Sequence, residues 1–143
     1  MAQFTIYLNF ENQTEEAFSF YKKVFRTEFE EEIQRFADMP ADENTPPLTN
    51  DEKNLVMHVG LPIFKGYMLR GSDVPKSMGE TIKKGNNMYI HLEVETFQEA
   101  DRLFNDLKEG GKIEMELEPQ FWGDYFGSVT DQFGIKWMVS CPK

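Results

Sequence analysis

Two titratable side chains, His91 and Glu93, stand two positions apart in a segment where polar and apolar residues alternate. In an extended strand this spacing places both side chains on one face. An imidazole beside a carboxylate can serve as an acid–base pair or can hydrogen-bond a bound ligand. The alternative is two polar side chains on a solvated strand face, and the sequence leaves both interpretations open.

A second group of candidate side chains lies near the N-terminus and in the middle of the chain. Tyr7 and Asn9 flank Leu8 in another alternating segment, which presents a phenol and an amide on one face. His58 follows Met57 in an apolar segment. For Tyr7 and Asn9 the alternative to ligand binding is packing, and for His58 it is a hydrogen-bonded structural histidine.

The segments that carry these candidates form a repeat. Apolar residues alternate over residues 4–10 and again over residues 88–94, which predicts two half-buried strands. A helical stripe of apolar residues follows each strand, and Ala17 in the first stripe corresponds to Ala100 in the second, 83 positions later. Strand and helix together predict a duplicated supersecondary unit.

The ends of the two helices carry capping residues. We expect Asn12 or Thr14 to cap the first helix, and Thr96 with Glu99 to form a capping box on the second. The Gly110–Gly111 pair predicts a left-handed end to the second helix.

Three β-type segments follow each helix, so each half is predicted to be a βαβββ module. The expected strands are residues 28–36, 55–64 and 67–71 in the first half and residues 113–118, 125–131 and 136–140 in the second half. This pattern predicts an α+β fold and a single domain, residues 1–143, with module 1 at about 3–72 and module 2 at about 87–143. The proline-rich insertion 37–54 is expected to be a mobile lid or partly disordered.

Composition excludes several classes of function. The net charge is −10 over 143 residues, a field that repels nucleic acid and anionic lipid, so we expect neither as a partner. A charged ligand should then be a cation. We find no apolar run of membrane-spanning length and no signal peptide, which indicates a cytoplasmic protein. The single cysteine, Cys141, excludes an intrachain disulfide and a zinc site built on several thiolates.

The duplicated unit resembles the vicinal oxygen chelate superfamily of glyoxalases, bleomycin-resistance proteins and extradiol dioxygenases, and most closely its PhnB-like branch. The resemblance spans nearly the whole chain, and it departs from the family pattern at Arg26–Thr27 and at residues 70–73. It is carried by YLNF at 7–10, EAFSFY at 16–21, Met57–His58, GKIEM at 111–115, FWG at 121–123, FGSVTDQFG at 126–134 and Trp137–Met138.

The resemblance implies two modules in one curled mixed sheet around a cavity, with helices outside, and a homodimer. Residues expected under the helices are Ile6, Leu8, Phe10, Ile90, Leu92, Val94, Trp137 and Val139. Residues expected to face the cavity are Thr5, Tyr7, Asn9, Tyr89, His91, Glu93, Lys136, Met138 and Ser140. Trp122 is expected either to wall the cavity or to belong to the core.

The metal-ligand positions of the family fall on side chains that bind metals poorly. Carried over by strand register, these positions are Thr5, about Met68, Tyr89 and Met138, and none supplies an imidazole or a carboxylate. We therefore predict a protein without a cofactor that binds a small organic molecule in a metal-free cavity. The ligand-binding residues expected are Tyr7, Asn9, His58, Met68, Tyr89, His91, Glu93, Trp122 and Met138.

The alternative is a divalent-metal-dependent lyase, isomerase or dioxygenase of the same superfamily. Its metal ligands would come from His58, His91 and Glu93. That arrangement requires a strand register other than the one inferred above.

Overall fold

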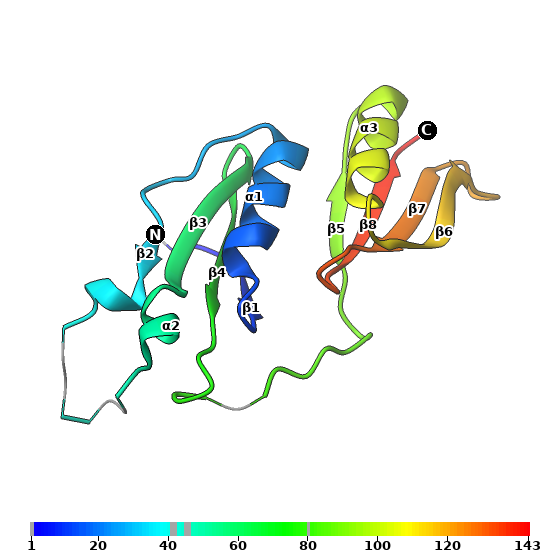
Figure 1. The fold of residues 1–143 in the computed structure, drawn as a ribbon. Coiled ribbons are helices and arrows are strands. Elements are labelled where there is room, and N and C mark those ends of the chain that lie inside the picture. The colour runs from blue at the N-terminus through cyan, green and yellow to red at the C-terminus, as the bar shows by residue number, and fades with distance from the viewer. Residues whose placement is uncertain (1, 41–42, 45–46, 80) are drawn as a thin grey trace. The chain divides into compact units, whose positions relative to one another are not determined.

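The computed structural model describes residues 2–40, 43–44, 47–79 and 81–143 and divides into two compact units, Met1–Lys83 and Lys84–Lys143. Each unit contains a four-stranded mixed sheet with one long helix against it (Figure 1). The order of elements confirms the α+β class and the two βαβββ modules.

The first sheet has the strand order β1-β4-β3-β2. Strand β1 (Ile6–Phe10) is parallel to β4 (Tyr67–Asp73), while β3 (Val56–Phe64) is antiparallel to β4 and to the short β2 (Gln34–Arg35). Helix α1 (Thr14–Phe25) packs on β3 and β4. The two central strands therefore lie beneath the helix.

The second sheet repeats this topology in the order β5-β8-β7-β6. Strand β5 (Ile90–Glu93) is parallel to β8 (Lys136–Cys141), which is antiparallel to β7 (Tyr125–Thr130), and β6 (Lys112–Pro119) lies at the other edge. Helix α3 (Phe97–Leu107) packs on β8 and β7.

The apolar stripes and the alternating strands meet in the two cores, as the sequence predicts. Phe18 and Tyr21 on α1, and Leu103 and Trp137 in the second unit, are fully buried. Of the strand residues expected under the helices, all are buried except Ile6, which is half-buried.

A carboxylate from β4 caps α1, contrary to the expectation from local sequence. Gln13 is the N-cap residue and makes no side-chain capping bond, while Asn12 has a left-handed φ of 64°. The backbone N–H and the hydroxyl of Thr14 instead donate to Oδ1 of Asp73, at 3.1 and 2.8 Å. A buried negative charge at the positive end of the helix dipole stabilises this helix start.

The ends of α3 agree only partly with the expectation. The hydroxyl of Thr96 accepts from the N–H of Glu99 at 3.1 Å, as predicted, and the Glu99 carboxylate pairs with Arg102 at 2.8 Å. Lys108 caps the C-terminus in a right-handed helical conformation. The left-handed residue comes only at Gly110, with φ 72°.

The strand predicted at residues 28–36 is much shorter than expected. Only Gln34–Arg35 forms a strand, although the N–H of Glu30 donates to the carbonyl of Gly60 at 3.0 Å beside β3. Glutamate has a low strand propensity, and neighbouring carboxylates repel one another, so the acidic run of residues 28–32 does not continue the ladder.

The insertion 37–54 contains local structure where it is described; residues 41–42 and 45–46 lie outside the described residues. A 3₁₀ turn, η1 (Phe36–Asp38), and a short helix, α2 (Asn50–Lys53), occupy its ends. The carboxylate of Glu52 accepts from the hydroxyl and the N–H of Ser77 at 2.7 and 3.0 Å. These bonds fasten α2 to the segment after β4; mobility of the intervening residues stays a prediction.

Among the described residues, the search for membrane-spanning segments found no helix with the length and apolar character that crossing a bilayer requires.

Candidate functional site

Each sheet has one face under its own helix and one face turned away from that helix, which we call the open face. In the first unit Tyr7 and Asn9 are exposed while Leu8 and Phe10 are buried. In the second unit His91 and Glu93 are exposed while Leu92 is buried. The alternation thus places these four candidate polar residues on the open faces, as predicted.

The two open faces are equivalent in register. Tyr7 pairs with Arg70 on the adjacent parallel strand, and His91 pairs with Met138. Because Ile6 pairs with Leu69 in the first sheet as Ile90 pairs with Trp137 in the second, Tyr7 and His91 occupy the same position of the repeat.

On the first open face, Tyr7 and His58 interact directly. The Tyr7 hydroxyl lies 3.2 Å from Nδ1 of His58, and the two ring centroids are 5.8 Å apart. The phenol is 47% exposed and the histidine is half-buried. This contact orients the imidazole and leaves its Nε2 for another partner.

Asn9 lies two residues after Tyr7 on β1, on the same face of the strand. Its side-chain carbonyl accepts from the hydroxyl of Ser72 at 3.2 Å, so the two N–H donors of the amide point elsewhere. The first open face thus combines a phenol, an imidazole, an amide and a hydroxyl.

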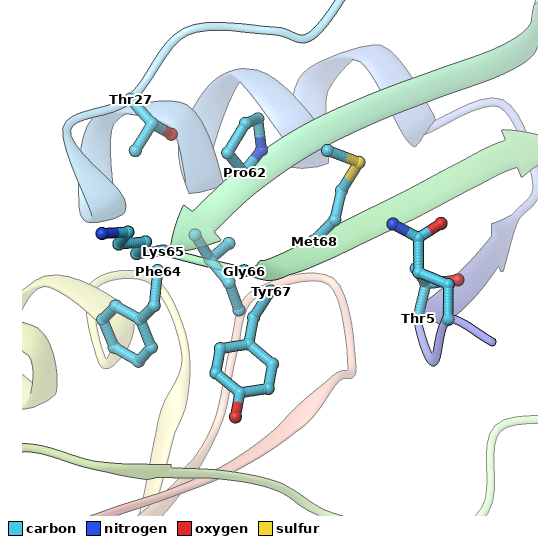
Figure 2. Close-up of a pocket in the computed structure, with 10 residues that line it drawn as sticks. Thr5, Thr27, Pro62, Phe64, Lys65, Gly66, Tyr67 and Met68 are labelled. Atoms are coloured by element: carbon cyan, nitrogen blue, oxygen red, sulfur yellow. The ribbon is translucent and has the colours of Figure 1, made fainter. Parts of the chain in front are cut away.

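A hollow of about 350 Å³ adjoins this face at the β3–β4 hairpin. Figure 2 shows Pro62 and Met68 on the two paired strands, Thr5 just before β1, and Thr27 in the loop after α1. The other residues that line the hollow are Gln3, Ile63, Phe64, Lys65, Gly66 and Tyr67. The hydroxyl of Thr27 is covered and makes no hydrogen bond with any described residue, so this mostly apolar hollow also contains one unsatisfied polar atom.

On the second open face, His91 contacts a hydroxyl and an aromatic ring. Its Nε2 lies 2.7 Å from the hydroxyl of Ser140, and its ring centroid is 6.3 Å from that of Phe126. The ring centroid of Trp122 lies 6.3 Å from that of Phe126. Trp122 is 51% exposed. Trp122 is therefore an exposed aromatic residue next to the His91 contacts and not part of the core.

Tyr89 belongs to a closed polar cluster with Glu114, Thr130 and Lys136. Its hydroxyl donates to Oε2 of Glu114, while the other carboxylate oxygen accepts from Thr130 at 2.5 Å and from Lys136. Lys136, followed by Thr130 and Tyr89, lowers the pKa of Glu114 from 4.5 to about 2. The Glu114 hydrogen bond in turn raises the pKa of the Tyr89 phenol. Every polar group of the cluster is engaged, which favours a structural role.

Three further residues have simpler environments. Glu93 stays exposed beside Ser140, and Met138 lies half-buried opposite His91. Burial raises the pKa of the Cys141 thiol, which disfavours a nucleophilic thiolate.

Within the part of the chain that the structure describes, no three His, Cys, Asp or Glu side chains group as potential ligands. A ligating histidine usually donates its other ring N–H to a carboxylate, a carbonyl or water, whereas His58 and His91 contact hydroxyl groups.

Sequence reasoning missed several residues of these faces. Phe126, Ser72 and the Glu114 cluster become recognisable only through strand pairing and hydrogen bonds. Alternation in residues 125–130 indicates which side chains share a face, but the partner strand decides what they contact.

The chain matches a known protein family and is similar to a protein of Escherichia coli. Residues 7–139 match the family described as the glyoxalase/bleomycin resistance protein/dioxygenase superfamily. Protein YjdN of Escherichia coli K12 is 30% identical over 96% of this chain and 93% of its own length.

Two solved structures are also similar. Protein PA1353 of Pseudomonas aeruginosa is 34% identical, with a TM-score of 0.83 over 99% of this chain and 98% of that chain. A PhnB protein from Bacillus cereus is 26% identical, with a TM-score of 0.75 over 98% of this chain and 99% of that chain.

Proposed function

Since the chain belongs to the glyoxalase/bleomycin resistance protein/dioxygenase superfamily, in its PhnB-like branch, we propose that each of its open faces binds a small organic molecule without a metal ion. The binding residues are Tyr7, Asn9 and His58 in the first unit and His91, Glu93 and Trp122 in the second. Met68 and Met138 supply apolar contact.

The observation that carries the proposal is a hydroxyl-bonded imidazole on each open face. His58 contacts the Tyr7 phenol, and His91 contacts the Ser140 hydroxyl. Such rings have a fixed orientation and one nitrogen to offer, which suits hydrogen bonding to a ligand. The hydroxyl of Tyr89, in contrast, is engaged by Glu114, so in this proposal Tyr89 contributes its ring and not its hydroxyl.

The hollow beside Met68 supports binding of a small molecule. Its volume of about 350 Å³ falls within the usual range for small-ligand sites, and its lining is mostly apolar with a few polar groups. A second hollow of about 590 Å³ lies near the C-terminus of α3, between Asn105 and Ile113. It is lined by no aromatic residue and by none of the proposed binding residues, so it does not enter the proposal.

The types of side chain at the expected metal-ligand positions support binding without a metal ion. Thr5, Met68, Tyr89 and Met138 occupy the positions at which the family resemblance implies metal ligands, and none of them supplies an imidazole or a carboxylate. Tyr89 is in addition hydrogen-bonded to Glu114. The metal-dependent lyase, isomerase or dioxygenase built on His58, His91 and Glu93 is the competing outcome. Elemental analysis of protein purified without chelator tests it: we expect no stoichiometric Mn, Fe, Ni or Zn.

We also propose a cytoplasmic homodimer and, for the second open face, which carries Glu93, a cationic ligand. The net charge of −10 supports a cation. The exposed rings of Phe121 and Trp122, whose centroids are 4.9 Å apart, offer contiguous apolar surface to a partner chain. Sedimentation at micromolar concentration should give a dimer. A stable monomer would contradict this part of the proposal.

Three variants of β5 test the ligand site. His91→Ala and Glu93→Ala change exposed residues, so they should leave thermal stability nearly unchanged and weaken binding of aromatic cations such as benzylammonium. Leu92→Ala removes a core side chain that is 3% exposed, so it should cost about 2–5 kcal/mol of unfolding free energy. If His91→Ala unfolds the protein while Leu92→Ala is neutral, the assignment of the two faces is wrong.

A further inference from the structure

We infer that the first open face holds a small oxyanion, a carboxylate or phosphate-type group, on the guanidinium of Arg70. The inference rests on the proposed function, since it names the chemistry that one part of that surface recognises. It concerns a different unit, and the opposite charge, from the cation expected near His91 and Glu93.

Arg70 lies in the middle of this face. It sits on β4, paired with Tyr7 of β1 on one side and with Gly60 of β3 on the other. The residue is half-buried, and its Nε is covered by protein atoms without a hydrogen-bond partner among the described residues. Gly60 has no side chain that could cover the guanidinium from β3.

The other arginines in the chain differ from Arg70. Of the four arginines, Arg35 forms a two-pronged pair with Glu15, and Arg102 pairs with Glu99. Arg26 is exposed at the end of α1. Arg70 is thus a half-buried guanidinium for which the described residues supply no carboxylate within ion-pairing distance.

An unpaired, partly desolvated guanidinium is unfavourable in the free protein. A covered donor that is left unsatisfied is destabilising. An oxyanion accepts two parallel N–H bonds from the planar guanidinium, which a cation or a neutral ring cannot do. The covered Nε is out of a ligand's reach, so an oxyanion would accept from the Nη groups, which are not among the covered unsatisfied atoms, and it would supply the counter-charge that the described residues do not.

Neighbouring donors extend the site. The Asn9 carbonyl is engaged by Ser72, so its amide N–H groups can donate to an anion, and Nε2 of His58 has no partner among the described residues. Asn9 and Ser72 are paired two positions along the same strands from Tyr7 and Arg70 in the ladder register. The donors therefore lie side by side on the two strands.

One carboxylate opposes the anion. The side chain of Glu30 is exposed and extends over Gly60, the residue of β3 that pairs with Arg70. A Cβ on Gly60 would lie 3.4 Å from Oε1 of Glu30. Glu30 lies outside ion-pairing distance of Arg70 and repels an incoming anion. Removing its charge should strengthen oxyanion binding, a gain that a merely structural arginine would not produce.

The test is an NMR titration that follows the Nε–Hε signals of the four arginines, with Arg70 assigned by its loss in Arg70→Lys. The probes are benzoate, phenyl phosphate and benzylammonium, which present a carboxylate, a phosphate or a cation on the same ring. We expect the Arg70 signal to shift saturably with an anion and not with benzylammonium. The stronger of the two anions identifies the chemical source.

Variants make the outcome decisive. Arg70→Gln should lower anion affinity by about tenfold or more, Glu30→Gln should raise it, and Arg26→Lys is the matched control without effect. An unmoved Arg70 signal at about 10 mM anion, or equal affinity in wild type, Arg70→Gln and Glu30→Gln, would overturn the inference. If benzylammonium still binds in a His91-dependent manner, the proposed function stands while this inference fails.

Discussion

The Tyr89 hydroxyl donates a 2.5 Å hydrogen bond to Oε2 of Glu114, although Tyr89 precedes the edge strand β5 and Glu114 lies on β6 at the other edge of the second sheet. The contact spans β8 and β7, where Lys136 and Thr130 join it. The cluster therefore links the two edges of the second sheet across its open face.

The Glu114 cluster predicts an acid-sensitive stability. The hydrogen bond from Lys136 and those from Thr130 and Tyr89 lower the pKa of Glu114 from 4.5 to about 2. Because the folded chain binds this proton less readily than the unfolded chain, the stabilisation is complete above the ordinary pKa and is lost as pH falls toward the folded value.

Urea unfolding at several pH values measures this effect. The unfolding free energy of wild type should fall more steeply from about pH 5 to about pH 2 than that of Glu114→Gln. Parallel pH profiles for the two proteins would show that the cluster contributes nothing to folding.

The buried carboxylate of Asp131 should be required for stability. It is 3% exposed and accepts hydrogen bonds from the N–H groups of Phe133 and Ile135 and from the indole of Trp137, at 2.8, 3.0 and 2.8 Å. Asp131→Ala leaves these donors unpaired and should cost about 3 kcal/mol. Chemical denaturation followed by tryptophan fluorescence checks this, with the exposed Glu116→Ala as control; equal midpoints would contradict it.

Gly71 permits the close approach of α1 to the first sheet. A Cβ at this position would lie 2.6 Å from Cε1 of Phe18 and 2.8 Å from the carbonyl oxygen of Leu8. Gly71→Ala should therefore cost about 2 kcal/mol through overpacking. Gly85→Ala, whose Cβ would lie 3.6 Å from Asn87, should be close to neutral in the same calorimetric measurement. A neutral Gly71→Ala would indicate that the helix sits further from the sheet.

The repeated modules could be predicted because local periodicity encodes them. Alternation in residues 4–10 and 88–94 and the stripes through Ala17 and Ala100 correspond to strands and helices in the structure. The faces of His91 and Leu92 follow from the same alternation. These features depend on neighbouring residues along the chain, which a single sequence contains.

Contacts between distant segments could not be predicted in this way. Asp73 caps α1 from 59 residues away, and Glu114 meets Tyr89 from 25 residues away. No local signal distinguishes these carboxylates from those of the acidic run at residues 28–32. That Arg70 has no hydrogen-bond partner for its Nε among the described residues could not be predicted either, because it depends on which residues of β1 and β3 lie beside it.

The two histidines of the chain offer the most direct test of metal-free ligand binding, because each open face carries one of them. The measurement is an NMR titration of their Cε1–Hε1 signals, assigned with His58→Gln and His91→Gln. Benzoate, phenyl phosphate and benzylammonium are added with and without chelator, and Mn²⁺ is added separately. We expect saturable shifts with at least one organic probe, unchanged by chelator, and two signals that persist at stoichiometric Mn²⁺. Loss of both signals at one equivalent of Mn²⁺, with organic probes binding only when the metal is present, would contradict it.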